Sequence, residues 1–476
     1  MHRTTLTLAA AVLIQSAAAH GQELSGLAAA MAIEKAVVAA IARSERSVVA
    51  IAMFKAPSAD DPFNNFRDGD TPELDAVPDA FATGVVIDRK GLILTTKHSL
   101  KSAEDFPQQY IRVAGKPLWI PVERVIGSDP FSDLAVLKVS ETHLDTLKLQ
   151  PIQMGDASKL KKGQIVITLG NPYAIARDGE VSASWGIVSN LRRRAPPKPS
   201  NSPQEARPTM HHFGTLIQTD AKLNLGTSGG PLLNVQGEMV GLTTSMAALV
   251  GFEKSAGYAI AVDDVFHRVL DTLKQGREVE YGFLGIGPGD LSQFERRKGQ
   301  QGVRVMRVLP GTPASGLLQV HDVITHIGDK PLLTTADLML TVGQHAPDSR
   351  ILLKVLRFDR PLSVPVTLTK NRISGDRVVT APKPAWRGLR VEYPSALRSL
   401  TFIEPIPSGC VIITGVEPES PADRAGLTPD KRIHSVENTA VSTPSEFAKA
   451  VADHKGPVRI VLTDDRLGLS TVIVQP

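Results

Sequence analysis

The residues best suited to chemistry form a glycine-rich turn around one serine. Residues 226–230, with the sequence Gly-Thr-Ser-Gly-Gly, place a hydroxyl between glycines, which allow a tight turn that a side chain would resist. Serine is a weak nucleophile at neutral pH and needs an adjacent base. Such a turn can aim the amides of Gly226 and Ser228 at one point, as an oxyanion hole requires. Taken alone, the motif fits a plain glycine turn equally well.

A histidine and an aspartate earlier in the chain could activate this serine. His98 stands just past the apolar strand expected at 92–95, where a loop side chain can reach a cleft. Asp133 stands at the entry to the strongly apolar run 134–139. The chain order His, Asp, Ser is that of chymotrypsin-type enzymes, which is one of several orders known for catalytic triads. The alternatives are a structural histidine and a turn-forming aspartate.

Short β-rich runs must position these residues. Turn-forming residues separate the runs, and many short strands with such punctuation favour an antiparallel sandwich or barrel. Apolar periodicity predicts helices near 27–43 and 262–274. Two polar segments, 56–80 and 192–212, are expected as long loops. The expected strands are 47–53, 84–87, 92–95, 111–113, 134–139, 165–169, 186–188, 239–243 and 258–261.

The chain beyond residue 280 contains an internal repeat. Residues 282–286, Gly-Phe-Leu-Gly-Ile, are matched to 388–391, Gly-Leu-Arg-Val. The polar, proline-containing segment 371–384 between the copies is a good linker. Two copies of one module of about 90 residues are the natural interpretation. Further matches pair 308–314 with 416–422, 322–324 with 431–433, and 336–338 with 445–447.

The composition is that of an ordinary globular protein, with 42% hydrophobic and 21% charged residues. At about 100–200 residues per domain, a chain of 476 residues suggests two to four domains. The formal net charge of +4 comes from scattered residues. The one short basic cluster, 192–194, is expected to be a solvated loop, so no nucleic-acid partner is predicted.

No metal or nucleotide cofactor is expected. The His, Cys and Asp residues show no metal-ligand spacing, and the motif Gly-x-x-x-x-Gly-Lys-Ser/Thr does not occur. The single cysteine, Cys410, excludes an internal disulfide and lies in the apolar run 410–413, where a buried thiol is expected. The fold must therefore depend on its hydrophobic cores.

The first residues have the order of a secretory signal peptide. Residues 1–3 are a short positive start, 6–14 are apolar, and small residues follow, with cleavage expected after Ala19 or Gly21. The apolar run is shorter than the roughly 20 residues that a membrane-spanning helix needs, and no other stretch approaches that length. We therefore expect an exported protein without a membrane span after cleavage; an uncleaved anchor or a buried helix is the alternative.

Several stretches together resemble the HtrA (high-temperature-requirement) family of trypsin-fold serine proteases, whose members carry one or two C-terminal PDZ domains. The resemblance implies a mainly β fold, with a chymotrypsin-like double β-barrel followed by two α+β PDZ-like domains. The matching stretches are 94–98, 132–138, 169–172, 186–189, 217–221 and 224–234. The implied parts are a signal peptide at 1–21, a protease domain at 22–278, and PDZ domains at 279–372 and 383–476.

The resemblance also assigns roles to individual residues. It implies that His98 is the general base, that Asp133 orients it and that Ser228 is the nucleophile, with the amides of Gly226 and Ser228 as the oxyanion hole. The end of one strand would line the substrate backbone through Thr243, Thr244 and Ser245. The PDZ loops would present backbone amides to the C-terminal carboxylate of a peptide, which then adds to the sheet edge. The PDZ residues concerned are Gly282, Phe283, Leu284, Gly285, Ile286, Gly388, Leu389, Arg390 and Val391.

The chain departs from the family pattern near both candidate catalytic loops. The family usually has Asn and Pro where this chain has Thr227 and Leu225, and Asn and Val where it has Thr96 and Ser99. None of these changes removes a catalytic group. In the second PDZ-like segment, Asp-Lys-Arg at 430–432 replaces the usual Gly-Asp pair, so this loop is expected to differ.

The function implied by the resemblance is ATP-independent hydrolysis of peptide bonds in unfolded or damaged proteins, in the periplasm or another compartment outside the cytoplasm. The family also implies homo-oligomers built from trimers. The alternative is a chaperone or scaffold that binds proteins while its protease domain is idle. Labelling with a serine-reactive fluorophosphonate distinguishes the two. For the PDZ modules, the separate alternative is that one or both are spacers or assembly surfaces.

Overall fold

The computed structural model describes residues 26–55, 76–116, 118–171, 179–194, 209–244, 256–397, 406–464 and 468–476. The predicted signal peptide and most of the loop predicted at 56–80 lie outside these ranges. Within them, no helix combines the length and the apolar character needed to cross a bilayer.

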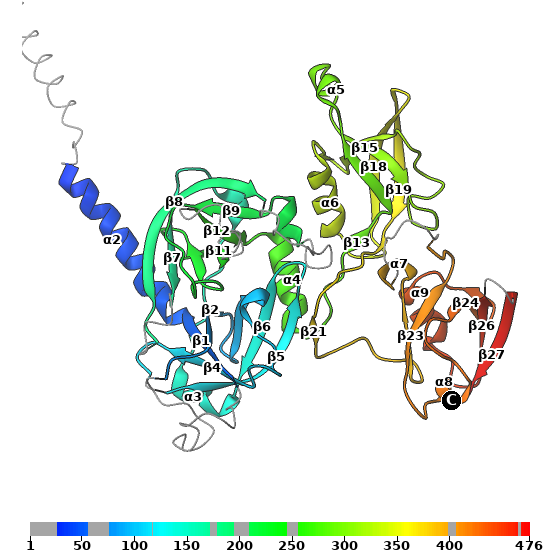
Figure 1. The fold of residues 1–476 in the computed structure, drawn as a ribbon, viewed down its shortest axis with the longest axis horizontal. Helices are drawn as coiled ribbons and strands as arrows, with labels where there is room; N and C mark the ends of the chain where they lie inside the picture. The colour runs from blue at the N-terminus through cyan, green and yellow to red at the C-terminus, as the bar shows by residue number, and fades with distance from the viewer. Residues whose placement is uncertain are drawn as a thin grey trace, which may run out of the picture.

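The first element is the helix α2, Gly26–Ser44, which agrees with the helix expected near 27–43. It projects away from the rest of the protease region, which it joins only at its C-terminal end (Figure 1). There the hydroxyl of Ser44 donates to the carbonyl oxygen of Gly237 at 2.9 Å. The short 3₁₀-helix η1, Glu45–Ser47, then leads into the first strand.

The first barrel consists of antiparallel strands in the order β5-β4-β1-β2-β3-β6, closed by pairing of β5 with β6. Alternating apolar side chains such as Ile51, Ile93 and Ile111 fill its interior. The strands are β1 Val48–Phe54, β2 Ala80–Val86, β3 Leu92–Thr96, β4 Gln108–Val113, β5 Ile120–Asp129 and β6 Leu134–Val139; the short helices are η3 Lys97–Ser99, η4 Glu141–His143 and α3 Leu144–Leu147.

The second barrel is closed in the order β10-β11-β12-β9-β8-β7. Its strands are β7 Ile165–Gly170, β8 Ser182–Arg193, β9 Leu216–Thr219, β10 Pro231–Leu233, β11 Met239–Thr244 and β12 Gly257–Ala261. Three helices accompany it: η5 Ala157–Lys159, η7 Met210–Phe213 and α4 Asp264–Lys274.

One hydrophobic core joins the two barrels. It contains Leu94 and Leu134 of the first barrel, Leu242 of the second, and Phe266 of α4, all of them buried. Burial of such side chains at about 25 cal/mol per Å² is the main force that holds the barrels together. The mainly β, chymotrypsin-like double barrel expected from the sequence is thereby confirmed, and each expected strand is present.

Two modules with the same strand order follow. In module 1 the order is β14-β15-β16-β18-β19, and in module 2 it is β22-β23-β24-β26-β27, so the internal repeat is real. Each module has its own apolar core. Module 1 contains β13 Gly282–Phe283, β14 Ile286–Asp290, α5 Gln293–Arg297, β15 Val303–Val308, β16 Val323–Ile327, β17 Lys330–Pro331, α6 Thr335–Gln344, β18 Arg350–Arg357, β19 Arg360–Thr367 and β20 Thr369–Lys370. Module 2 contains β22 Leu389–Glu392, α7 Pro394–Leu397, β23 Val411–Val416, α8 Pro421–Arg424, β24 Arg432–Val436, β25 Thr439–Ala440, α9 Pro444–Ala452, β26 Val458–Asp464 and β27 Gly468–Val474.

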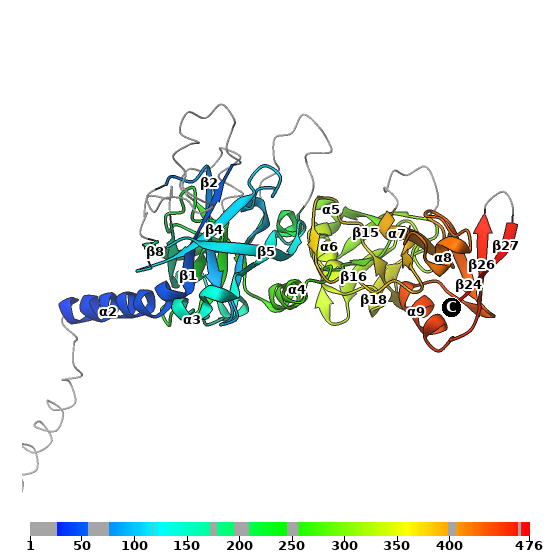
Figure 2. The same ribbon diagram turned by 90° about the horizontal axis from the view of Figure 1, so that it is seen from below.

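The protease region, module 1 and module 2 lie in a row (Figure 2). The expected linker between the modules is not a simple tether, because it returns to the first barrel. There it forms the short strand β21, Val378–Val379, which pairs antiparallel with Ser128 and Gly127 at the end of β5. Cys410 is buried directly before β23 of module 2, as its apolar neighbours predicted.

Candidate active site

His98 and Asp133 meet at the end of the first barrel. Strands β3 and β6 are paired neighbours, so the residue after one strand and the residue before the other lie side by side. The ring Nδ1 of His98 lies 2.7 Å from Oδ2 of Asp133, and the backbone amide of His98 donates to Oδ1 at 2.9 Å. Because an ionised carboxylate only accepts hydrogen bonds, the ring must carry its proton on Nδ1.

The protein holds Asp133 buried and ionised. Its backbone is left-handed, with φ of 58°, and its carbonyl oxygen accepts the amide of Lys97 at 2.8 Å. Burial by itself would raise the pKa of Asp133, but the charge and hydrogen bonds of His98 outweigh it and leave that pKa below its ordinary value. The pair therefore has a fixed negative charge behind the imidazole.

The other ring nitrogen, Nε2 of His98, is ready to accept a proton. The His98 side chain is 21% exposed, yet Nε2 itself is buried and, among the described residues, has no hydrogen-bond partner. With the proton on Nδ1, Nε2 carries the lone pair. This is the atom that a general base uses to take a proton from a neighbouring hydroxyl.

The serine turn of the second barrel is fixed against strands of the first. The amide of Thr83 in β2 donates to the carbonyl oxygen of Ser228 at 3.0 Å, and its hydroxyl donates to Gly226 O at 2.7 Å. The hydroxyl of Thr95 in β3 donates to Thr83 O at 2.8 Å. Since Thr95 is three residues before His98, these contacts bring Ser228 to the same end of the first barrel as the His98–Asp133 pair.

Two glycines are required for this turn. Gly226 and Gly229 have φ of 96° and 87°, a region that side chains resist. A Cβ atom on Gly229 would lie 2.1 Å from Thr83 O and 2.2 Å from Thr95 Oγ1. Close docking of the turn on the first barrel therefore depends on the absence of a side chain at Gly229.

Thr243, which was expected to line the substrate, instead contacts the serine turn. Its side chain is fully buried, and its hydroxyl donates to Thr227 O at 2.6 Å. The amide of Gly229 donates to Thr243 O at 2.9 Å, so β11 braces the serine turn. Thr244 is also buried, at 2% exposure, and Ser245 lies outside the described residues. Contact of this strand with a substrate stays a prediction.

A buried histidine behind Asp133 was missed by sequence reasoning. His211 in η7 is fully buried; its Nε2 lies 2.9 Å from Ser132 O and its Nδ1 lies 2.6 Å from the hydroxyl of Thr215. Burial lowers the pKa of His211 and outweighs the attraction of the Asp133 charge, so the ring is neutral. The expectation of a long loop over 192–212 is therefore wrong at 192–193, which lie in β8, and at 210–212, which lie in η7. No local motif signals the burial of His211.

The candidate peptide-binding loops of the two modules align in a different register from the expected one. Gly285 and Gly388 both have left-handed backbone, with φ of 86° and 83°. The carbonyl of Gly285 accepts the amide of Leu309 at 2.9 Å, and that of Gly388 accepts the amide of Glu417 at 2.8 Å. Gly388 thus corresponds to Gly285, whereas residue identity had matched it with Gly282. The backbone conformation, which identity alone does not reveal, decides the register.

The loop of module 2 is closed by its own hydrogen bonds. The amide of Leu389 donates to Trp386 O at 2.8 Å, and the amide of Trp386 donates back at 3.0 Å. A peptide carboxylate would find the Leu389 amide already in use. Of the residues predicted here, Leu389, Arg390 and Val391 lie in β22, beside a cavity of about 710 Å³. Its apolar lining includes Trp386, Leu389, Val391, Phe447 and Val451.

Comparison with known proteins places this chain among serine proteases with PDZ modules. Residues 82–242 match a family described as a trypsin-like peptidase domain, and residues 282–368 and 412–463 each match a PDZ domain family. The periplasmic pH-dependent serine endoprotease DegQ of Escherichia coli (strain K12) is 30% identical over 400 residues, which cover 82% of this chain and 80% of that protein.

Two further relatives extend the comparison. A probable periplasmic serine endoprotease, DegP-like, of Hahella chejuensis is 29% identical over 377 residues, which cover 78% of this chain and 74% of that protein. The solved structure of the HtrA-type protease AlgW with a tripeptide covers 71% of this chain and 98% of its own, with a TM-score of 0.53 at 22% identity. At 22% identity, this similarity shows a shared fold and nothing further.

Proposed function

Because this chain belongs to the HtrA/Deg family of serine endoproteases, we propose that His98, Asp133 and Ser228 are its catalytic triad. The chain is a serine endopeptidase with two PDZ modules, and the proposal assigns the catalytic roles to these three residues. The observation that supports it most is the state of His98, whose Nδ1 is paired with Asp133 while Nε2 has no hydrogen-bond partner in the part of the chain that the structure describes.

In the first half-reaction Ser228 Oγ attacks the carbonyl carbon of the scissile peptide bond, and its proton passes to Nε2 of His98. Asp133 stabilises the imidazolium that results. The amides of Gly226 and Ser228 stabilise the negative oxygen of the tetrahedral intermediate. The C–N bond then breaks as His98 returns the proton to the leaving amine, and an ester on Ser228 remains.

The second half-reaction repeats these roles with water. His98 removes a proton from a water molecule, which attacks the ester carbonyl, and the same amides hold the new oxyanion. The ester bond then breaks, and the proton returns from His98 to Ser228 Oγ. No cofactor or nucleotide takes part, in keeping with ATP-independent hydrolysis.

The proposed substrates are unfolded or damaged proteins, with the PDZ modules capturing exposed C-termini. Module 1 is the better candidate for capture, because the loop of module 2 uses the Leu389 amide internally. The relatives are named as periplasmic enzymes, which supports export to the periplasm or another extracytoplasmic compartment. Assembly into trimers or larger homo-oligomers is proposed by family analogy, and mass photometry measures it.

Fluorophosphonate labelling tests the proposed triad. The wild type should label at one serine, while Ser228→Ala and His98→Ala should not label. Ser182→Ala, in β8 of the same barrel, is the matched control and should label normally. Labelling of Ser228→Ala at the wild-type rate would reject the nucleophile, and an unlabelled but folded wild type would favour an idle protease domain.

A further inference from the structure

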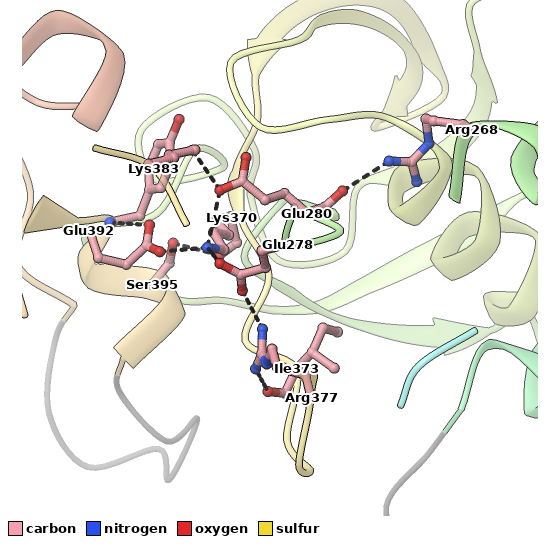
Figure 3. Close-up of polar contacts among 10 residues, drawn as sticks. Arg268, Glu278, Glu280, Lys370, Ile373, Arg377, Lys383, Glu392 and Ser395 are labelled. Carbon is pink, nitrogen blue, oxygen red and sulfur yellow. Dashed lines mark hydrogen bonds and ion pairs between the residues drawn. The ribbon is translucent and has the colours of Figure 1, made fainter. Parts of the chain in front are cut away.

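A buried lysine lies where the protease region and both modules meet. Lys370, at the end of module 1, is 3% exposed, and its ammonium lies 2.9 Å from Glu278, 3.1 Å from Glu280 and 2.5 Å from Glu392 (Figure 3). The first two glutamates belong to the segment that follows α4, and Glu392 belongs to β22 of module 2. These three carboxylates are close enough together to hold a metal ion, but the ammonium lies among them.

Two cations of the inter-module linker complete this group. Arg377 contacts Glu278, and Lys383 lies 2.7 Å from Glu280. Burial would lower the pKa of Lys370, but the three carboxylates raise it well above its ordinary value, so the lysine is charged. We call Lys370, the three glutamates, Arg377 and Lys383 the Lys370 cluster. It joins four segments: the end of the protease region, module 1, the linker and module 2.

The same short segment, 278–281, also reaches into the protease core. Tyr281 is 1% exposed, and its hydroxyl donates to Oδ2 of Asp129 at 2.5 Å. Arg268 of α4 holds this segment from the other side: it donates to Glu280 O at 3.1 Å, and its guanidinium lies 5.3 Å from the centre of the Tyr281 ring. One end of the segment thus contacts Lys370 and the other contacts Asp129.

Asp129 fixes the turn that carries Asp133. Its Oδ2 also accepts the amide of Ser132 at 2.8 Å and the hydroxyl of Ser132 at 2.6 Å. Phe131, in the middle of this turn, packs edge-on against the Tyr281 ring with centroids 4.8 Å apart. The linker strand β21 lies beside the same place, since Val378 donates to the Ser128 hydroxyl at 3.0 Å.

We propose that Tyr281 is a positioning residue for the His98–Asp133 pair, acting through Asp129 and the turn 129–133. The Lys370 cluster holds Tyr281 in place, and the docking of module 2 therefore sets the rate of the chemical step. This inference rests on the proposed triad, because its effect passes through Asp133.

The first test removes only the hydroxyl, with Tyr281→Phe in the full chain. Loss of the one hydrogen bond to the buried Asp129 carboxyl should lower kcat on a short chromogenic peptide by about three- to tenfold. KM should not change, because no substrate contact is touched. A displaced Asp133 stabilises the imidazolium less, so the acid limb of the kcat profile should move to lower pH by a few tenths of a unit. If Tyr281 only stabilised the fold, Tyr281→Phe would leave the acid limb of the kcat profile unchanged.

The second test loosens the cluster with Lys370→Met. Lys354→Met is the matched control, because Lys354 forms an exposed ion pair with Asp329 on module 1. Only Lys370→Met should lower kcat with KM unchanged. The double variant Tyr281→Phe/Lys370→Met should be no slower than Tyr281→Phe alone, within about twofold, because both changes act through one path. If Lys370→Met does not fold, Glu392→Gln replaces it and removes only the module 2 partner.

Fluorophosphonate titration separates this inference from the proposed function. If the wild type is labelled and neither Ser228→Ala nor His98→Ala is, the proposed nucleophile and base stand, whatever the Tyr281 and Lys370 variants show. A folded Tyr281→Phe with the kcat and pH profile of the wild type would then overturn the positioning role. Equal kcat values for Lys370→Met and Lys354→Met would overturn the coupling to module 2.

Discussion

Asp133 holds His98 at two points, the ring through Oδ2 at 2.7 Å and the backbone through Oδ1 at 2.9 Å. The first contact sets which ring nitrogen carries the proton, and the second sets where the ring stands. A change that keeps the shape of Asp133 therefore tests its charge and its hydrogen bond to Nδ1 without removing the side chain.

Asp133→Asn is that change. An amide NH₂ facing Nδ1 would move the proton to Nε2, which could then no longer act as the base, and kcat on a short peptide should fall by about 10⁴-fold. Thermal unfolding and the oligomer size serve as controls and should stay close to those of the wild type. A loss of less than about tenfold would contradict the role of Asp133.

Gly229→Ala tests the docking of the serine turn. The added methyl group would collide with Thr83 O and Thr95 Oγ1 in a backbone conformation that already disfavours side chains. Gly163→Ala is the matched control, because Gly163 has nearly the same φ, 88°, but nothing within 4 Å of its Cβ position. The control should lose about 1–2 kcal/mol of stability and keep its activity.

Gly229→Ala should lose more stability than this control and should also lose proteolysis, because the turn must move away from β2. Denaturant unfolding gives the first quantity and peptide hydrolysis gives the second. Equal stability losses for the two variants would show that the close contact with Thr83 does not constrain the turn.

The individual strands and the candidate catalytic residues could be predicted because their signals are local, whereas the closure into two barrels was implied only by the family resemblance. His98 and Asp133 each stand at the end of an apolar run, and Ser228 stands in a glycine turn. The fold and the family are confirmed, and the roles of these three residues stay a prediction. Contacts between distant segments leave no such signal: Thr83 meets Gly226 across 143 residues, and Tyr281 meets Asp129 across 152.

The register of the second module shows why residue identity misleads. Gly282 and Gly388 are both glycines before apolar residues, but only Gly285 and Gly388 share a positive φ. Nothing in the sequence indicates β21, because two valines in a polar linker are too short a strand signal. They form a strand only by pairing with the edge of β5.

The buried His211 should make the free energy of unfolding depend on pH. Its pKa is lowered in the folded protein, so the unfolded chain takes up the proton first as the pH falls. The free energy of unfolding should therefore decrease below the ordinary histidine pKa of about 6.5 and level off below the folded-state pKa. Denaturant unfolding between pH 5 and pH 8 measures this slope.

The slope should be shallower in His211→Gln, whose side chain can still donate to Ser132 O and accept from Thr215 but does not titrate. His454→Gln, at an exposed position in module 2, is the control and should keep the wild-type slope. The same slope in all three proteins would mean that other groups cause the pH dependence.

Truncation tests how far the chemistry depends on the chain beyond the second barrel. All three triad candidates precede residue 230, and the predicted protease domain ends at 278. Sequence reasoning therefore expects deletion of 280–476 to spare short peptides more than unfolded proteins, since a long substrate reaches both a PDZ site and the cleft. The structure indicates that this deletion should also destabilise the protease region, because Val279, Tyr281 and Ile373 pack in its core.

We therefore expect two separable losses in a series of truncated chains. A chain ending at 385 keeps Tyr281 and β21 but loses Glu392, so its kcat on a short peptide should fall only about three- to tenfold. A chain ending at 278 loses the core residues as well, and it should be less stable and slower still on the same peptide. Cleavage of an unfolded protein should fall further than peptide cleavage in both, because capture is lost. After sizing in solution, equal kcat values on the short peptide for all three lengths would show that the protease region needs nothing after residue 278.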